Sequence, residues 1–226
     1  LTDEKTQNDF FTVTVNNISD CGITDGKISI NSTPGTGTTL FSINNGSSWQ
    51  SGNIFSSLPA GNYYVKIKND NNSCEVIYQN NPVVITAPTP PVFVTVTSTN
   101  VSDCNLTDGS ISIQATPGSS GIEYSINNGN NWQASNTFSG LDAGSYFVKI
   151  RNNNGTCIVS WPSNPVLVTK PSPPGFISVS FTNTTDCSLN NGTITVQASQ
   201  GSGAIRYSID NGSSWQNHGN FTGLAP

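Results

Sequence analysis

The cysteines are the residues whose type and spacing point most directly to chemistry in this chain. Cys21 and Cys74 lie 53 positions apart, and Cys104 and Cys157 repeat that interval 83 positions later. A pair that recurs with a fixed spacing favours one disulfide inside each repeated unit. We therefore predict the bonds Cys21–Cys74 and Cys104–Cys157, with Cys187 unpaired in this chain. Disulfides persist in oxidising compartments, so the pattern also predicts an exported protein.

Metal binding is the competing interpretation of the cysteines. A zinc site needs about four ligands, whereas each unit offers two cysteines, and the single histidine, His218, is not repeated. One aspartate recurs in the same polar turn, as Asp20, Asp103 and Asp186, and a calcium ion bound there is an alternative. Aspartate in such a turn usually bonds to its own backbone. We expect no metal and no other cofactor.

The residues that recur with the 83-residue period do not form a recognisable catalytic set. An active site needs a nucleophile, a base or a metal cluster held in one place. No histidine or glutamate recurs in the repeated pattern. We expect that this chain is not an enzyme.

A turn that contains tryptophan is present three times. Its copies occupy residues 41–50, 124–133 and 207–216 and contain Trp49, Trp132 and Trp215. The third copy, Ser-Ile-Asp-Asn-Gly-Ser-Ser-Trp from Ser208, resembles the Asp-box of sialidases and many unrelated β-proteins, whereas the others carry Asn44 and Asn127 in place of the aspartate. Asparagine and glycine tolerate positive φ, so we predict a tight hairpin with the tryptophan packed beneath it. A glycosidase or glycan-binding role is the functional alternative.

A band of aromatic and basic residues is the candidate binding face. The strand that we expect to begin at Tyr63 alternates, so that one set of side chains points inward and the other outward. The outward set and its counterpart in the second unit are Tyr64, Lys66, Lys68, Phe147, Lys149 and Arg151. An aromatic ring beside two cations could stack on a sugar or meet an acidic partner. An ordinary solvated face is the alternative interpretation.

The elements that would position these residues follow the 83-residue period. Short alternating strands are separated by turns rich in glycine, asparagine and proline, and about seven such strands in about 80 residues are typical of a β-sandwich. The segment Leu-x-Ala-Gly-x-Tyr, at residues 58–63 and 141–146, resembles the tyrosine corner of Ig-like sandwiches. We predict an all-β chain of tandem Ig-like β-sandwich repeats joined by proline-rich linkers.

The phase of the repeat predicts the domain boundaries. Residues 1–9 end a preceding repeat, 10–87 form repeat 1, 88–91 a linker, 92–170 repeat 2, 171–174 a second linker, and 175–226 a truncated repeat 3. Proline fixes φ, so we expect semi-rigid linkers. We expect the chain to be a segment of a longer array, with neighbouring repeats as its partners, and repeat 3 not to close its sandwich alone.

Composition excludes other classes of partner. The formal net charge is -5 and the chain has only eight lysines and arginines, which argues against binding to nucleic acid or to anionic membrane surfaces. Hydrophobic residues make up 34% of the chain, and no apolar run approaches the length that spans a bilayer. We expect no membrane insertion in this segment.

Several motifs together resemble a known repeat. They are Cys-x-x-Thr-Asp-Gly-x-Ile from Cys21, the Tyr/Phe-Ser-x-Asn-x-Gly turn, and Leu-x-Ala-Gly-x-Tyr-x-Val-x-Ile followed by a closing cysteine. They look like the SprB-type repeat of very large surface adhesins of gliding Bacteroidetes, over nearly all of repeats 1 and 2 and the first half of repeat 3. The resemblance implies an exported, outer-membrane-associated filamentous adhesin, and in some cases gliding motility.

Two functional hypotheses follow. In the first, the chain is a structural or adhesive stalk segment of a large cell-surface protein, with surface polysaccharide as a candidate partner. In the second, each repeat is a carbohydrate-binding module appended to a secreted glycosidase. The second hypothesis requires exposed aromatic platforms, and the candidates are Tyr64 with Phe147 and Tyr78 with Trp161.

Overall fold

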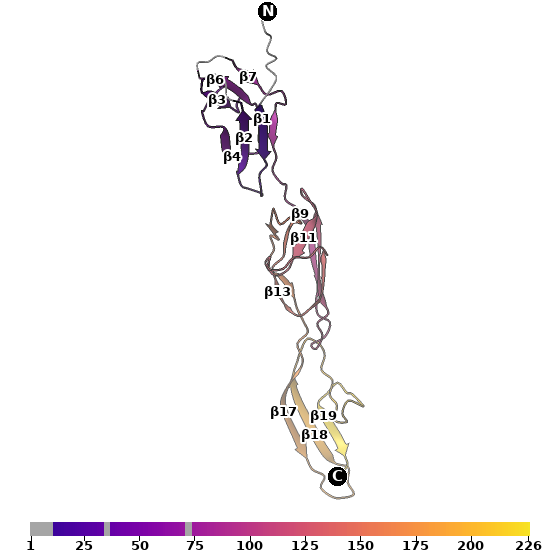
Figure 1. Ribbon diagram of the computed structural model, residues 1–226. Coiled ribbons are helices and arrows are strands. Elements are labelled where there is room, and N and C mark those ends of the chain that lie inside the picture. The colour runs from indigo at the N-terminus through magenta and orange to yellow at the C-terminus, as the bar shows by residue number, and fades with distance from the viewer. Residues whose placement is uncertain (1–10, 34–36, 71–73) are drawn as a thin grey trace, which may run out of the picture. The chain divides into compact units, whose positions relative to one another are not determined.

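The computed structural model describes residues 11–33, 37–70 and 74–226. Every regular element in these residues is a β-strand, and the strands pair into several sheets (Figure 1). The prediction of an all-β chain of tandem Ig-like sandwich repeats is confirmed. The segment at residues 1–9, predicted to end a preceding repeat, lies outside the described residues.

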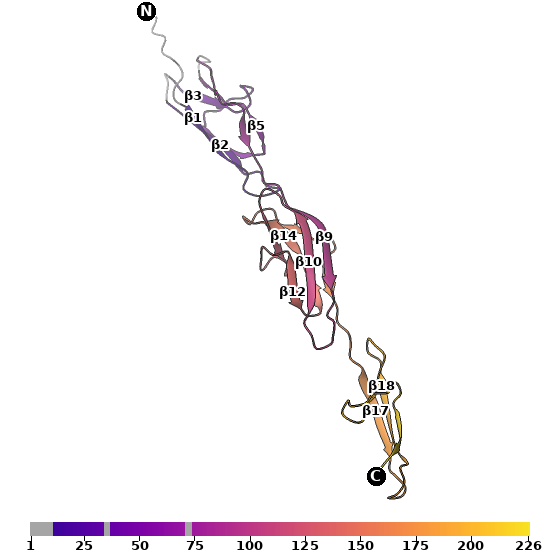
Figure 2. The ribbon, with the colours of Figure 1, turned by 90° about the vertical axis from the view of Figure 1, so that its right-hand side faces the viewer.

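Repeat 1 builds a sandwich from short antiparallel strands (Figure 2). Its described residues form β1 (Phe11–Asn16), β2 (Gly26–Ser32), β3 (Thr39–Ser42), β4 (Ile54–Leu58), β5 (Gly61–Tyr63), β6 (Lys66–Asn69), β7 (Val76–Ile77) and β8 (Val83–Ile85). The strand orders of its sheets are β1-β2-β4, β3-β6-β7 and β5-β8.

The core of repeat 1 follows from alternation along these strands. On β2, Ile28 and Ile30 are fully buried while Lys27 and Ser29, which alternate with them, are partly exposed. Both isoleucines belong to one hydrophobic cluster with Phe41, Val65 and Ile85, which come from other strands or from the segments beside them. Burial of one such side chain contributes roughly 1.5–3 kcal/mol, so this cluster is what holds the sheets of repeat 1 together.

The chain changes sheets directly after the corner tyrosine. We expected one strand from Tyr63 to Lys68, but β5 ends at Tyr63 and pairs with β8, whereas β6 begins at Lys66 and pairs with β3. The buried Val65 lies between them. The side-chain amide of Asn81 accepts a hydrogen bond from the Val65 N–H at 2.8 Å and donates one to its carbonyl at 2.9 Å. The Asn81 amide therefore replaces a strand partner at this break.

The tyrosine corner is confirmed in both complete repeats. The Tyr63 hydroxyl donates a hydrogen bond to the Pro59 carbonyl at 2.8 Å, and the Tyr146 hydroxyl donates one to the Asp142 carbonyl at 2.9 Å. Burial raises the pKa of Tyr63. Each bond ties the start of a strand to the turn that precedes it.

Repeat 2 has the same succession of strands. They are β9 (Val92–Thr99), β10 (Gly109–Thr116), β11 (Ile122–Ser125), β12 (Thr137–Leu141), β13 (Gly144–Tyr146), β14 (Lys149–Asn152), β15 (Val159–Ser160) and β16 (Val166–Val168). Their sheets have the orders β12-β10-β9, β11-β14-β15 and β13-β16. Ile111, Ile113 and Ile150 are fully buried, as the repeat pattern requires.

Repeat 3 contains one sheet in its described residues. Its strands are β17 (Gly175–Thr182), β18 (Gly192–Ser199) and β19 (Asn220–Leu224), in the order β17-β18-β19. Apolar side chains on β17 stay in solvent: Phe176 is 84% exposed and Phe181 is 71% exposed. In the described residues, no second sheet covers the β17-β18-β19 sheet as one does in repeats 1 and 2.

Compact units do not follow the repeat boundaries. One unit comprises Leu1–Val94, Gln114–Ala134 and Val148–Pro162, and the other comprises Thr95–Ile113, Ser135–Phe147 and Ser163–Pro226. Repeat 2 therefore contributes segments to both units. The first unit contains the joint between repeats 1 and 2, and the second contains the following linker.

Candidate functional site at the repeat joint

The polar turn before β2 is stabilised by an aspartate. Asp25 accepts hydrogen bonds from the Ser19 N–H at 3.0 Å and from the Ser19 hydroxyl at 2.6 Å. Asp108 and Ser102 repeat this arrangement, and Asn191 takes the place of the aspartate in repeat 3. The serine hydroxyl, followed by the backbone N–H, lowers the pKa of Asp25 and of Asp108. These carboxylates are thus committed to the turn.

The cysteine of this turn bonds to a cysteine in the next repeat. A disulfide joins Cys21 to Cys157 across 136 positions of sequence, and Cys74, Cys104 and Cys187 are free thiols. The predicted bonds Cys21–Cys74 and Cys104–Cys157 are therefore wrong. An interval of 53 within a repeat and one of 136 between repeats follow from the same positions, so spacing alone could not choose between them.

Asp20 contacts both halves of the disulfide. Its Oδ1 accepts hydrogen bonds from the Cys21 N–H at 2.7 Å and from the Cys157 N–H at 2.6 Å. Cys157 is buried and has a φ of 58°, a left-handed conformation that is uncommon for a residue with a side chain. A carboxylate acceptor for its N–H therefore helps to hold the Cys157 loop in place.

The linker between repeats 1 and 2 is hydrogen-bonded to repeat 2. The Thr89 carbonyl accepts a bond from the Ser119 N–H at 3.0 Å and one from Asn152 Nδ2 at 3.1 Å, and the Thr89 N–H donates to the Ser119 hydroxyl. Gly118 permits this approach, because a Cβ there would lie 2.0 Å from the Thr89 carbonyl oxygen. Hydrogen bonds to repeat 2, in addition to the prolines, therefore restrict the conformation of this linker.

The second linker repeats this arrangement. The Ser172 N–H donates to the Ser202 hydroxyl at 2.7 Å, and the Ser202 N–H donates to the Ser172 carbonyl at 3.0 Å. A Cβ on Gly201 would lie 2.2 Å from that carbonyl oxygen. Our sequence interpretation missed these contacts, although the glycine recurs at the same position of repeats 2 and 3.

Each linker also meets the cysteine of the preceding turn. Cys21 Sγ lies 3.3 Å from the Pro88 carbonyl oxygen, and the Cys104 thiol donates to the Pro171 carbonyl at 3.2 Å. Cys104 and Cys21 therefore occupy equivalent positions against their linkers. Of these two cysteines, Cys21 is bonded to another cysteine of the described residues and Cys104 is a free thiol.

Three potential metal ligands meet at this joint. Asp20, Cys21 and Cys157 have ligand atoms within 4.8 Å of one another, but the two sulfurs are bonded to each other. The other aspartates considered for calcium use their oxygens locally. Asp103 accepts from the Asn105 N–H, and Asp186 accepts from the N–H and hydroxyl of the serine two residues on.

Three cations of the candidate binding face, Lys66, Lys68 and Arg151, are engaged inside their own repeats. Lys66 forms an ion pair with Glu75 at 2.8 Å, and Lys68 Nζ lies 4.4 Å from the ring centroid of Trp49. These contacts place the cations over the tryptophan turn rather than beside an open ligand site.

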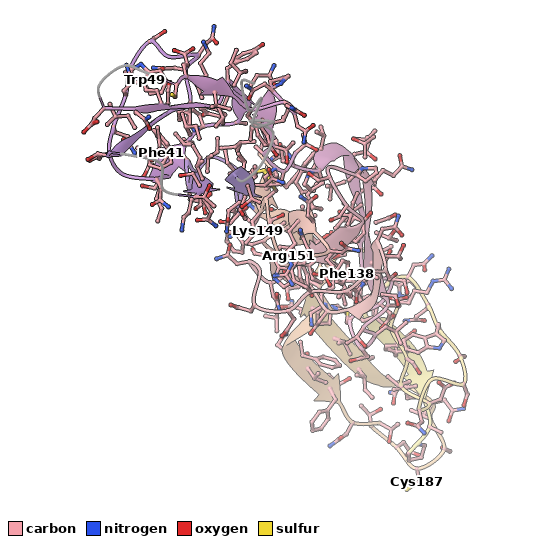
Figure 3. The ribbon with its side chains drawn as sticks, turned by 45° about the horizontal axis from the view of Figure 1, so that its top comes forward. Phe41, Trp49, Phe138, Lys149, Arg151 and Cys187 are labelled. Carbon is pink, nitrogen blue, oxygen red and sulfur yellow. A yellow bond between two sulfur atoms is a disulfide. The ribbon has the colours of Figure 1, made fainter. Side chains whose placement is uncertain are left out.

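In repeat 2, Arg151 makes the same two kinds of contact, an ion pair and a contact with the tryptophan ring. Arg151, on β14 with Lys149 (Figure 3), pairs with Glu123 at 2.8 Å and lies 4.3 Å from the ring centroid of Trp132. The aromatic members of the band behave differently from these cations. Tyr64 and Phe147 are each 46% exposed, so they are the accessible part of the predicted band.

The other proposed aromatic platform is packed into the fold. Tyr78 packs against the hydrophobic cluster of repeat 1. Trp161 makes an edge contact with Phe93, with ring centroids 5.1 Å apart. Both side chains are partly buried, in contrast to the exposed Tyr64 and Phe147.

The tryptophan turn is closed by a single bridge rather than by two strands. Tyr207 bonds to Gln216 in both directions, and the same bridge occurs in the other copies. Asp210 accepts hydrogen bonds from the Ser214 hydroxyl at 2.5 Å, the Ser214 N–H at 3.0 Å and the Ser208 hydroxyl at 2.7 Å. These bonds, the Ser214 hydroxyl first, lower the pKa of Asp210 to about 2.

Asparagine fills the place of Asp210 in the other two turns. Asn44 Oδ1 accepts from the Ser48 N–H at 2.9 Å, and Asn127 Oδ1 accepts from the Asn131 N–H at 2.9 Å. The turn therefore folds with either residue. The bonds of this asparagine or aspartate side chain stay inside the turn, as expected for the structural interpretation of the Asp-box resemblance.

Known proteins match this chain only at low similarity. No family model matches this chain, and no curated protein matches it in sequence. A solved structure titled as a biofilm-associated protein BSP domain is 16% identical, with a TM-score of 0.24, over 71% of this chain and 30% of that one. Domains 4–9 of the surface layer protein SbsC are 16% identical, with a TM-score of 0.26, over 83% of this chain and 36% of that one. The chain thus spans about a third of these structures.

No helix long and apolar enough to cross a bilayer occurs in the part of the chain that the structure describes.

Proposed function

We propose that this chain is a stalk segment of a large exported cell-surface protein, with a structural or adhesive role and no catalytic activity. The observation that carries the proposal is the joint between repeats 1 and 2. There a disulfide links Cys21 to Cys157, and the linker is hydrogen-bonded through Thr89 to the following repeat. A segment that only spaces two binding domains needs neither feature, whereas a stalk under tension benefits from both.

The resemblance to SprB-type repeats supports a more specific version. On that version the parent protein is an outer-membrane-associated filamentous adhesin of the kind used in gliding, with surface polysaccharide as a candidate target. An antibody raised against this chain should then label intact cells that make the parent protein. Labelling that appears only after lysis would refute the exported location.

The same bond is proposed to recur along the array. Cys104 matches Cys21 in its turn and in its contact with the linker carbonyl. Cys74 matches Cys157 in backbone conformation, with φ values of 55° and 58°. We therefore expect Cys104 to bond to a cysteine placed like Cys157 in a following repeat, and Cys74 to bond to one placed like Cys21 in a preceding repeat.

Pulling the chain by its ends tests the stalk proposal. Because 136 positions separate the bonded cysteines, the disulfide withholds the intervening residues from extension. Single-molecule unfolding of the Cys21→Ser variant should therefore give a contour length roughly 450–490 Å longer than that of the oxidised wild type. The Cys74→Ser variant, which removes a free thiol, is the matched control. Equal contour lengths for wild type and Cys21→Ser would contradict the proposal.

Carbohydrate binding is the second candidate function. The observation that favours it is the exposure of Tyr64 and Phe147, each at 46%. A glycan array probed with the wild type and with a Tyr64→Ala/Phe147→Ala variant tests it, since both side chains are exposed and their loss should leave the fold intact. Binding by the wild type that the double variant loses would support this function, and an absence of wild-type binding would remove it.

A further inference from the structure

Several asparagines of this chain are followed directly by glycine. In such a pair the glycine nitrogen can attack the side-chain amide of the asparagine, because glycine has no Cβ to hinder the approach. The structure describes every such pair, namely Asn45-Gly46, Asn128-Gly129, Asn154-Gly155, Asn191-Gly192 and Asn211-Gly212. Their hydrogen bonds decide which pair is arranged for this reaction.

Asn154 holds its side-chain carbonyl over the peptide that follows it. Its Oδ1 accepts hydrogen bonds from the Thr156 N–H at 3.3 Å and from the Thr156 hydroxyl at 2.8 Å. An asparagine that bonds to the N–H two residues on closes a turn around the intervening peptide. The turn therefore holds Asn154 Cγ beside the Gly155 nitrogen, as ring closure between them requires.

The two Thr156 donors also favour the reaction electrostatically. When the nitrogen attacks Cγ, negative charge develops on Oδ1, and donors that are already in place stabilise that charge. The buried Asn152 donates from Nδ2 to Thr156 Oγ1 at 3.2 Å. This bond occupies an acceptor site of the hydroxyl and leaves its proton directed at Asn154.

The Gly155 nitrogen is accessible. The residue is exposed, and a Cβ placed on it would meet nothing within 4 Å. Its N–H donates to the Asn152 carbonyl at 2.9 Å. Because an N–H lies in the plane of its peptide, this bond fixes the orientation of the peptide and leaves the face of the nitrogen open.

The other pairs are held differently. In the tryptophan turns, Asn45, Asn128 and Asn211 have positive φ, and the N–H of the glycine that follows each of them donates to a serine hydroxyl oxygen. The Asn191 side chain bonds to the N–H and the hydroxyl of Thr185, six residues before it. Neither arrangement holds the side-chain carbonyl over the following peptide.

We propose that Asn154 is a site of spontaneous deamidation in the folded chain. The Gly155 nitrogen bonds to Asn154 Cγ, the bond from Cγ to the side-chain nitrogen breaks, and ammonia leaves with the proton of the Gly155 amide. Water then opens the resulting succinimide at one of its two carbonyls and gives aspartate or isoaspartate. This modification does not depend on the stalk function.

The modified residue lies in the loop that carries Cys157 of the disulfide. The Asn152 N–H donates to the Thr156 carbonyl at 2.9 Å, and Cys157 follows directly. Isoaspartate adds one methylene to the backbone of this loop, and both products add a carboxylate. Deamidation is therefore a time-dependent change in the covalent structure of the joint.

Ageing of the intact 226-residue chain tests the proposal. The oxidised protein is kept at mildly alkaline pH, digested at acidic pH, and mapped by mass spectrometry, with labelling by an isoaspartyl methyltransferase to identify isoaspartate. We expect the products at Asn154 to accumulate about tenfold faster than at the other pairs, which corresponds to about 1.4 kcal/mol in the barrier. In chain denatured by urea the pairs should react at similar rates, because their local sequence is alike.

Variants of Thr156 test the role of the hydroxyl. Thr156→Val removes this donor and keeps the N–H and the size of the side chain, so deamidation at Asn154 should slow about two- to tenfold. Thr156→Ser keeps the hydroxyl and should react at the rate of the wild type. Rates at Asn154 no higher than at the other pairs of the folded chain would overturn the proposal. An unchanged or faster reaction in Thr156→Val would also overturn it, since loop mobility and not the two donors would then set the rate.

Discussion

Asp210 differs from its counterparts Asn44 and Asn127 in being able to titrate. Its pKa is about 2, below the ordinary 3.8, because the Ser214 and Ser208 groups donate to the carboxylate. A lowered pKa in the folded state means that the carboxylate stabilises the turn fully above about pH 3.8 and that this contribution is lost as the pH falls through about 2. The asparagine turns have no such dependence.

This difference predicts an acid-sensitive turn in repeat 3 alone. Between pH 4 and 2, by the pKa values above, the amides of Gly212 and Ser214 should lose protection in NMR hydrogen exchange, while those of Gly46 and Ser48 should not. The variant Asp210→Asn should abolish the difference. A common response of all three turns would show that acid acts on the whole fold instead.

Tyr63 and Tyr146 each donate one hydrogen bond to a carbonyl of the corner turn. Replacing either with phenylalanine removes the bond and keeps the ring. We expect the free energy of opening of the adjacent strand pair to fall by about 1 kcal/mol, measured by amide exchange on β8 for Tyr63→Phe. Tyr64→Phe alters an exposed neighbour and is the control. A loss of equal size in the control would contradict the role given to the corner hydroxyl.

At the scale of elements, the joint depends on a close approach between a linker and a loop. A methyl group at Gly118 would meet the Thr89 carbonyl oxygen at 2.0 Å, so the backbone must move apart. We expect Gly118→Ala to cost about 1–3 kcal/mol, seen as faster exchange of the Ser119 amide, which bonds to that carbonyl. Gly61→Ala is the control, because a Cβ there meets nothing within 4 Å.

A Gly118→Ala chain with an unchanged Ser119 amide would show that the linker is not held by this loop. The same reasoning applies at Gly201, where the approach to Ser172 is similar. Both linkers make matching hydrogen bonds to the repeat that follows them. This attachment is therefore a feature of the repeat and is not specific to one joint.

At the scale of the whole molecule, the central prediction concerns which cysteines pair. Residue 226 corresponds to residue 143, so a copy of residues 144–170 appended after Pro226 completes repeat 3 and supplies an equivalent of Cys157. Non-reducing peptide mapping should then find the added cysteine bonded to Cys104, with the Cys21–Cys157 bond retained. Oxidised glutathione serves as the electron acceptor: two thiols lose two protons and two electrons, and the small disulfide becomes two thiols.

A bond between the added cysteine and Cys187 would instead establish pairing inside one repeat and would contradict the recurrence of the joint. The same extension with its cysteine replaced by serine controls for folding of the completed sandwich. In that control Cys104 should react with iodoacetamide, as in the original chain, where it is free.

The sequence by itself determined the repeat, the all-β sandwich and the local turns. Period-two alternation decides which side chains of a strand are buried, as with Ile28 and Ile30, and this depends only on neighbours along the chain. The corner tyrosines and the tryptophan turns are equally local, because each bonds to backbone within a few residues. Such features can be predicted since their partners lie within the same short segment.

Only the tertiary structure decided the long-range pairings. Cys21 lies 53 positions from one candidate partner and 136 from another, and the choice depends on where the next repeat brings Cys157. The break after Tyr63 likewise depends on Asn81, which supplies hydrogen bonds from outside the strand. Lys68 on β6 lies over the ring of Trp49 because the fold brings β6 next to the tryptophan turn. Contacts between distant segments are set by packing of whole sheets, which residue spacing does not encode.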